Sequence, residues 1–192
     1  MFGPREDGDV RMKSRGQEAA ALLKSWQAIP TRIEGAIRGL SGSALDARGG
    51  DENWSIRETV HHLVEANLIA SNILLAALAG SASPYDWSWV IPSSTWMRRL
   101  GYARAPVRPA LSALEGLCGH FAVLLAACRG GFDREIRLLD SRGARPRATT
   151  VRKILEEQVD HAREHLKVVA RLRAEVVQAK GRPRRRRSAR RR

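Results

Sequence analysis

The stretch VRKILEEQVDHAREHLKVVARLRAEVV, residues 151–177, decides how the rest of the chain can be arranged. Its apolar residues recur with the spacing of one helix face, which predicts a single long amphipathic helix. His161 and His165 lie one turn apart within this apolar stripe, between Ile154 and Leu172. An ionisable group is costly at a buried position unless it has a partner. The remaining chain must therefore supply groups that face the two histidines.

Composition indicates one globular domain with a basic tail. The 192 residues are enough for a single domain with a sizeable core, and 43% of them are hydrophobic. The net charge is +14, but residues 180–192 hold nine Lys and Arg residues and no acid, so the preceding part carries only +5. We expect residues 1–16 to be a flexible lead-in, residues 17–179 to form the folded domain and residues 180–192 to be a disordered Arg-rich tail.

Cysteine use and hydropathy favour a cytoplasmic protein. Cys118 and Cys128 both fall in an apolar helical pattern, and their ten-residue spacing places them too far apart along one helix for a disulfide. We expect both to be reduced core residues. No apolar run reaches the roughly 18 residues that a membrane span needs, and the charged N-terminus lacks a signal-peptide core.

A second long helix has the clearest start in the sequence. Ser55 followed three residues later by Glu58 is the pattern of a capping box, and Trp54 precedes it as a hydrophobic staple. The apolar periodicity continues to about Leu78, and Gly80 should end the helix.

A helical wheel separates two adjacent histidines of this second helix. His62 shares its side with Ala66 and Ile69, toward the apolar face, whereas His61 shares its side with Glu65, toward the polar face. We therefore expect His62 to point into the protein and His61 to be a solvated surface residue.

Two further helices complete the predicted fold, which is an all-α four-helix bundle. One covers residues 17–40, with a kink or break near Ile29 because Pro30 removes a backbone donor. The other covers residues 109–129. A long connection joins the second and third long helices, so the bundle need not run simply up and down.

The connecting segments are less regular. Residues 41–53 are rich in Gly, Ser and Asp, as in a loop, and residues 132–148 form a connector in which Arg142-Gly143 marks a turn, as at the tip of a small hairpin. Residues 81–105 are too long and too aromatic for a simple linker, and we expect a short helix at about residues 94–100. We expect the tryptophans of this segment either to pack in the core or to line a pocket: Trp87, Trp89 and Trp96.

Three histidines form the candidate metal site. His161 and His165, at positions i and i+4 of one helix, present two nitrogens to a facing helix, where His62 supplies a third. Three neutral imidazoles suit Zn first, and also Ni or Fe. Three protein ligands leave one position open, which is the pattern of a catalytic rather than a structural site. That position would hold water or a thiolate as the reacting group.

Simpler explanations stand beside the metal site. Histidines occur at i and i+4 of helices by chance, and the pair alone is a weak signal. His120 falls at the edge of an apolar face, as a satisfied histidine would. Glu65 and Glu157 are candidates for support of the metal ligands, but carboxylates on helix surfaces commonly do no more than solvate a face.

The residues on which the site depends resemble the DinB-like (damage-inducible) metal-binding four-helix superfamily. In that family a Trp-Ser/Thr start is followed eight residues later by a ligand histidine, as Trp54 and His62 are here, and the last helix supplies a His-x-x-x-His pair, as His161 and His165 do. The resemblance covers about residues 17–177. It is specific through the combination of the three histidines.

The resemblance implies a homodimer with a divalent metal on His62, His161 and His165. It also implies a choice of chemistry, because characterised relatives include bacillithiol S-transferases and mycothiol-dependent maleylpyruvate isomerases, whose cofactor is a low-molecular-weight thiol. A hydrolase-like reaction through metal-bound water is the other chemistry that such a site allows.

A second hypothesis comes from the tail. Nine cations within residues 180–192 would bind phosphate polymers through counterion release, with little sequence preference. The alternative function is therefore a non-enzymatic basic helical protein that associates with nucleic acid. A solubilising tail without a partner explains the same composition.

Overall fold

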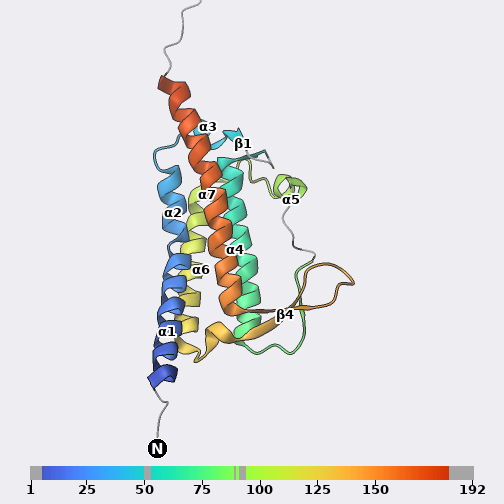
Figure 1. Cartoon of the computed structure of the whole chain (residues 1–192). Helices are drawn as coiled ribbons and strands as arrows, with labels where there is room; N and C mark the ends of the chain where they lie inside the picture. Colours follow the sequence, from blue (N-terminus) through green and yellow to red (C-terminus); the bar gives the residue numbers. More distant parts are fainter. Residues whose placement is uncertain (1–5, 50–52, 89, 91–93, 182–192) are drawn as a thin grey trace, which may run out of the picture.

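The computed structural model describes residues 6–49, 53–88, 90 and 94–181. Long helices form a bundle with a small sheet at one side (Figure 1). One column of the bundle consists of two consecutive helices, and the other three are single: α1 (Glu6–Gln27) and α2 (Ile29–Ile37), α4 (Ile56–Leu78), α6 (Val107–Ala127) and α7 (Val151–Gly181). The predicted four-helix bundle is confirmed.

The first column breaks where the sequence predicts, but it begins earlier. Pro30 stands in the first turn of α2, where a missing N–H is tolerated, and the chain breaks at Ala28. Helix α1 already starts at Glu6, so residues 6–16 are helical rather than the expected flexible lead-in. This stretch has no apolar periodicity that would reveal a helix. Residues 1–5 lie outside the described residues.

Helices α4 and α6 run parallel. Their starts meet at one end of the bundle, where Arg57 donates from Nη1 to the Ala105 carbonyl at 3.3 Å. At the other end Gly131, just beyond α6, packs against Leu78 at the end of α4. A helix of 23 residues is about 34 Å long, and the chain must travel back along it before α6 can start. This return explains the long connection, which contains α5 (Ser94–Arg99), the short helix expected there.

The fold is mainly helical, as expected, but two small sheets add to it. In the first, β1 (Arg48–Gly49) pairs antiparallel with β2 (Trp54–Ser55), within a segment expected to be a loop that also holds α3 (Gly42–Leu45). In the second, β4 (Glu135–Leu139) pairs parallel with β3 (Tyr85–Asp86) and antiparallel with β5 (Arg147–Thr150). The two-residue strands contain too few residues to show alternation, whereas burial does alternate along the five residues of β4. The hairpin anticipated at Arg142-Gly143 is confirmed, with Gly143 at φ +80°.

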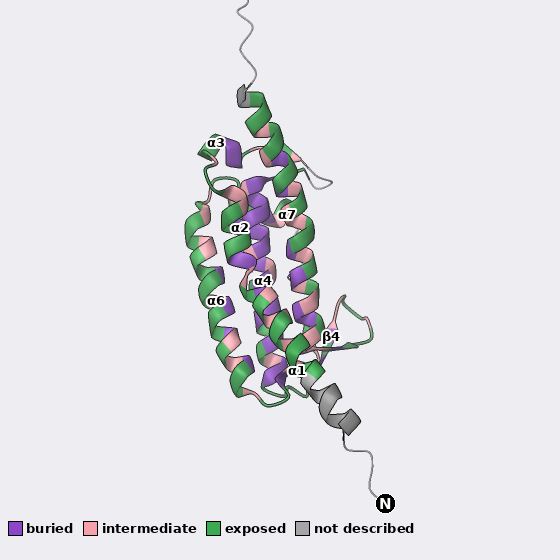
Figure 2. Ribbon diagram, turned by 60° about the vertical axis from the view of Figure 1, so that its left-hand side comes forward, coloured by how far each residue is buried: buried purple, intermediate pink, exposed green. Residues whose placement is uncertain are grey.

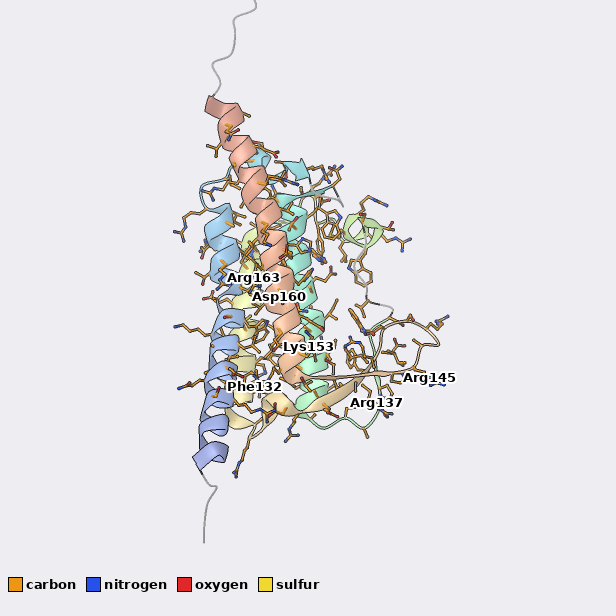
Figure 3. The ribbon with its side chains drawn as sticks, in the orientation of Figure 1. Phe132, Arg137, Arg145, Lys153, Asp160 and Arg163 are labelled. Atoms are coloured by element: carbon orange, nitrogen blue, oxygen red, sulfur yellow. The ribbon has the colours of Figure 1, made fainter. Side chains whose placement is uncertain are left out.

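Burial follows the inner faces of the helices (Figure 2). Trp26 of α1 and Asn67 of α4 are both completely buried, and the indole Nε1 donates to Asn67 Oδ1 at 2.8 Å. The outer side of α7 carries the charged side chains Lys153, Asp160 and Arg163 (Figure 3). The histidines of α7 therefore belong to the opposite, inner side of a strongly amphipathic helix.

Two helices, α4 and α6, are long and apolar enough to cross a membrane by length and composition alone. The prediction that no apolar run is long enough for a membrane span is therefore wrong by this test of length and composition. Core helices of soluble proteins pass the same test, and 61% of the most apolar window of α4 is buried within the bundle, against 22% for α6. The cytoplasmic location stays a prediction.

Candidate metal centre

The start of α4 fixes the position of His62. Ser55 Oγ accepts a hydrogen bond from Glu58 N at 3.1 Å, and the Glu58 carboxylate accepts from Ser55 N at 2.8 Å, which completes the predicted capping box. Arg48 of β1 also donates to Glu58, at 2.8 Å. Burial alone would raise the pKa of Glu58, but the hydrogen bonds from Ser55 and Arg48 hold it below its ordinary value. The first turn of α4 is thereby tied to the short sheet beside it.

Three histidines meet between α4 and α7, as the sequence predicts. His62 Nε2 lies 3.1 Å from His161 Nε2, and the ring centroids are 5.0 Å apart for His62 and His161, 4.9 Å for His62 and His165, and 4.6 Å for His161 and His165. One nitrogen from each ring lies within 4.8 Å of the others. We call these three residues the histidine triad.

Burial keeps two members of the triad, His62 and His161, neutral. It lowers the pKa of His62 to about 3, with smaller contributions from the neighbouring charges of His161 and His165. It also lowers the pKa of His161 to about 4, with a contribution from His165. Neutral imidazoles retain the lone pair that binds a metal ion. Protonation of His62 and His161 is thus disfavoured, and their ring nitrogens stay able to bind an ion.

The geometry of the triad fits a metal ion. In a tetrahedral site with metal–nitrogen bonds of about 2.0–2.1 Å, neighbouring ligand nitrogens are roughly 3.3 Å apart, close to the 3.1 Å between His62 Nε2 and His161 Nε2. His62 Nδ1 is buried and has no hydrogen-bond partner among the described residues. A buried polar atom without a partner is rare in proteins. Within the part of the chain that the structure describes, His62 Nδ1 therefore lacks the partner that a purely structural cluster would supply.

Trp54 covers one side of the triad. Its ring stacks on His165 with centroids 5.8 Å apart and planes at 11°, and it tilts over His62 at 4.7 Å. Its Nε1 donates to Ser94 Oγ at 3.2 Å, at the start of α5. The expected staple residue therefore also shields the histidines and connects them to the long segment between α4 and α6.

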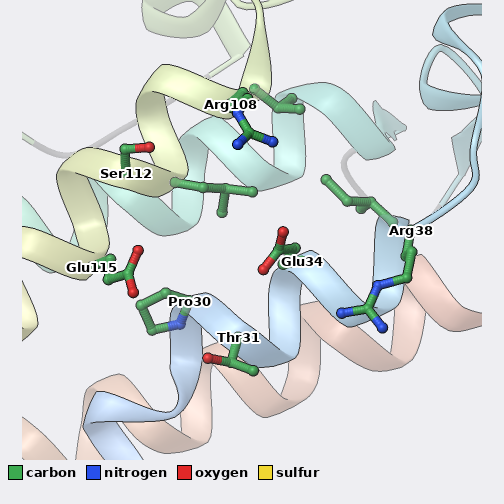
Figure 4. A pocket seen from close by; sticks show the side chains of 10 residues that line it. Pro30, Thr31, Glu34, Arg38, Arg108, Ser112 and Glu115 are labelled. Atoms are coloured by element: carbon green, nitrogen blue, oxygen red, sulfur yellow. The ribbon is translucent and has the colours of Figure 1, made fainter.

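A cavity of about 340 Å³ opens from the triad toward the hairpin. His62 and His161 line it at one end, and Trp87, Leu138 and Arg147 line it at the other. A second cavity, of about 300 Å³, lies between α2 and α6 and is lined by no histidine or cysteine. Glu34, Arg38, Arg108 and Glu115 surround this second cavity (Figure 4). Only the first combines concave apolar walls with candidate metal ligands.

Comparison with known proteins agrees with this arrangement. The model of the DinB superfamily matches residues 25–183. The chain belongs to the DinB superfamily. The resemblance inferred from Trp54, His62, His161 and His165 is thus confirmed at the level of the family.

Three relatives of this DinB superfamily protein are bacterial proteins. Proteins of Geobacillus thermodenitrificans, Geobacillus kaustophilus and Bacillus subtilis, each named a "putative metal-dependent hydrolase", are 25% identical over 58%, 68% and 65% of this chain. The matches span 61%, 74% and 65% of those proteins. The solved structure of YfiT from Bacillus subtilis superposes with a TM-score of 0.68 over 92% of this chain and 94% of that one, at 20% identity, which shows a shared fold. Its description names an unusual four-helix bundle topology.

His61 and Glu65 correct the helical wheel. His61 was expected at the surface, but it is only 7% exposed, stacks on Tyr102 with centroids 4.7 Å apart and lies with Nε2 3.2 Å from the Ala105 carbonyl. Glu65 is only 8% exposed, and its Oε1 accepts hydrogen bonds from Trp96 Nε1 and from Tyr102 OH. Burial raises the pKa of Glu65. Helix α5, through Trp96, and the segment after it, through Tyr102 and Ala105, cover this face of α4. A helical wheel of α4 alone cannot show this contact.

The other candidate residues lie outside the triad. His120 is exposed, and Cys118 and Cys128 are free thiols, with Cys118 buried as expected and Cys128 at the C-terminal cap of α6. Burial raises the pKa of Cys118 to about 12, which makes it an unreactive thiol. Glu157 is exposed at the rim of the cavity.

The three tryptophans of the long segment have different places. Trp87 lines the cavity beside the triad, and its Nε1 donates to Asp140 Oδ1 at 2.8 Å. Trp96 binds Glu65 instead. Trp89 lies outside the described residues.

Proposed function

We propose that this chain is a divalent-metal-dependent enzyme in which His62, His161 and His165 hold the ion, with zinc as the first expectation and nickel or iron as the others. The convergence of three imidazoles within 4.8 Å of one another, two of them kept neutral by burial, carries this proposal. The metal dependence named for the relatives supports it. A bound ion would lower the pKa of a thiol or a water molecule in its open position and so supply a nucleophile near neutral pH.

Within this class, we propose transfer of a low-molecular-weight thiol to an electrophile. The sulfur forms a bond to the electrophilic carbon, the leaving group departs with the bonding electrons, and the thiol proton passes to solvent. The chain contributes the ligands, the shield of Trp54 over one side and the cavity on another. Hydrolysis is the second candidate, because the relatives are named as hydrolases and water fills the same position as a thiol.

Metal analysis followed by an activity screen tests both proposals. We expect about one metal ion per chain in the purified protein and loss of that ion in His165→Ala. The matched control is His120→Ala, which removes an exposed histidine and should keep the ion. A panel of biological thiols with a chromogenic electrophile, run beside a panel of chromogenic esters and amides, then distinguishes transferase from hydrolase. Wild-type protein free of metal under all loading conditions would refute the metal centre.

The resemblance also leads us to propose a homodimer. Helix α6 presents an apolar outer side, on which Val123 is 68% exposed. Sedimentation at several concentrations should show a dimer, and Val123→Lys should shift it toward the monomer. A monomer at all concentrations would contradict this assembly.

The basic tail supports a separate candidate, non-specific contact with nucleic acid. Residues 182–192, which lie outside the described residues, contain eight of the nine cations in question. Truncation after Ala179 should abolish binding to duplex DNA and remove its steep salt dependence, whereas metal content should not change. DNA binding that survives truncation would exclude the tail as the contact.

A further inference from the structure

The cavity that opens from the triad has walls from three parts of the fold. Helices α4 and α7 form two sides, and the sheet closes the end away from the histidines through Leu138 of β4 and Arg147 of β5. Because His62 and His161 line the cavity directly, a molecule inside it would lie beside any ion that the triad holds.

The walls are mainly hydrocarbon. Ala66, Ile69, Ala70 and Ile73 of α4 face Ile154 of α7 across the space, and Trp87 adds an aromatic surface. A volume of about 340 Å³ falls at the lower end of the range for pockets that bind small molecules. Burying an apolar group here would be favourable by the area removed from water.

The charges at the far end of the cavity leave little attraction for a charged ligand. Arg147 is the only cationic residue among the lining residues, and Asp140 binds it through Nε at 2.9 Å and Nη2 at 3.4 Å. The hydrogen bond that Arg147 donates to Asp140, together with the negative charges of Asp140 and Glu157, raises the pKa of Arg147 against the opposing effect of burial. The charge of the guanidinium is thus compensated by Asp140, and the charge of the exposed Glu157 at the rim is screened by solvent.

One polar group of the cavity lacks a partner. Gln158 Oε1 is buried without a hydrogen bond among the described residues. Buried polar atoms in folded proteins are nearly always hydrogen-bonded to protein or water. A ligand with a hydrogen-bond donor at this position would provide that partner for the Gln158 amide oxygen.

We propose that this cavity binds the body of the substrate, and that the substrate is a small, uncharged, largely apolar electrophile with one hydrogen-bonding group opposite Gln158. That the bound molecule is a substrate rests on the proposed function, whereas the binding preference follows from the cavity alone. It excludes substrates that carry a carboxylate or an ammonium group on the part that enters the cavity.

Three probes of one shape test the preference. Benzamide is neutral, benzoate is its anionic analogue and benzamidine is its cationic analogue. Dissociation constants are measured by ligand-observed NMR on the purified protein and again after chelation, because benzoate can bind a metal ion directly. We expect benzamide to bind at least tenfold more tightly than either charged probe, most clearly in the chelated protein.

Two variants locate the binding. Ala66→Leu on α4 fills the cavity and should weaken benzamide binding at least tenfold, whereas Ala76→Leu enlarges another half-buried alanine of the same helix and should not. Gln158→Met keeps the volume and removes the amide, and should weaken benzamide about three- to tenfold, as for the loss of one hydrogen bond.

The outcomes separate this inference from the metal centre. Metal content is measured on every variant. Selective benzamide binding that responds to Ala66→Leu would uphold the cavity even in a protein without metal. Three outcomes in a protein with a full complement of metal would overturn the inference and leave the metal centre intact. They are no benzamide binding at 10 mM, equal binding of a charged probe after chelation, and benzamide binding that Ala66→Leu does not change.

Discussion

The two sides of α4 contrast sharply, although adjacent residues define them. On one side His62 meets His161 and His165, and its Nδ1 has no hydrogen-bond partner among the described residues. On the other side His61 lies against the Ala105 carbonyl and stacks on Tyr102. Both histidines are 7% exposed, so burial does not distinguish them.

What distinguishes the two sides is the kind of groups that meet there: on one side a carboxylate accepts from two donors, and on the other three imidazoles converge. The cluster of His61, Glu65, Trp96 and Tyr102 is held by hydrogen bonds and stacking, with Glu65 Oε1 as a shared acceptor. Only its second carboxylate oxygen finds no partner among the described residues. The triad instead brings three imidazole rings against each other, and burial, followed by repulsion from the neighbouring histidines, lowers the pKa of His62 and of His161. A structural role explains the first cluster, and a metal ion would complete the second.

The largest expected effect is on metal content. The double variant His161→Ala/His165→Ala should lose the bound ion almost completely, because a single remaining histidine is a weak ligand. His61→Ala should keep it, although the two sides share one helix. Elemental analysis of the purified variants gives the result. Equal metal loss in His61→Ala would abolish the distinction between the two sides.

The next effect is the pH dependence of stability in the metal-free protein. The pKa of His62 is about 3 and that of His161 about 4 in the folded state, against about 6.5 for an unfolded histidine. As the pH falls below 6.5, the unfolded chain takes up protons that the folded chain does not. The stability present above pH 6.5 is therefore progressively lost, by up to about 1.4 kcal/mol per pH unit for each such histidine.

Urea unfolding between pH 7 and 5, where most carboxylates stay ionised, measures this loss. His161→Gln should flatten the slope, whereas the exposed His120→Gln should leave it unchanged. A wild-type stability that is constant across this interval would show that the triad is not buried in its neutral form.

These two predictions concern residues that the sequence identifies well. His62, His161 and His165 each lie on the apolar side of their own helix, so local periodicity suffices to bring them together once two helices pack. The capping box of Ser55 and Glu58 is equally local. Burial of His61 and Glu65 depends on Trp96, Tyr102 and Ala105, which are more than 30 residues away and have no periodicity of their own. The two-residue strands β1, β2 and β3 form through pairing with other segments. Local sequence patterns therefore do not predict them either.

A smaller effect is expected on the side of α4 that carries His61 and Glu65. Glu65→Ala removes the acceptor of Trp96 Nε1 and Tyr102 OH and should cost about 1–3 kcal/mol of unfolding free energy through the unsatisfied donors. Glu65→Gln keeps one acceptor oxygen and should cost less. Glu157→Ala, at an exposed position, should change stability by no more than about 0.5 kcal/mol. Metal content should stay the same in all three, and a loss of metal in Glu65→Gln would make this carboxylate part of the metal centre.

The smallest effect concerns the connection between the two sides. Trp54→Phe keeps an aromatic ring over His165 and His62 but removes the Nε1 donor to Ser94 Oγ. Because Ser94 is exposed, the lost hydrogen bond should cost only about 0.5–1 kcal/mol, measured by urea unfolding. Ser94→Ala should reproduce this cost, and the double variant should add nothing further, since both changes remove the same bond. Metal affinity that falls in Trp54→Phe and equally in Ser94→Ala would show that the segment over the His61 side also positions the triad, and the two sides of α4 would then act as one site.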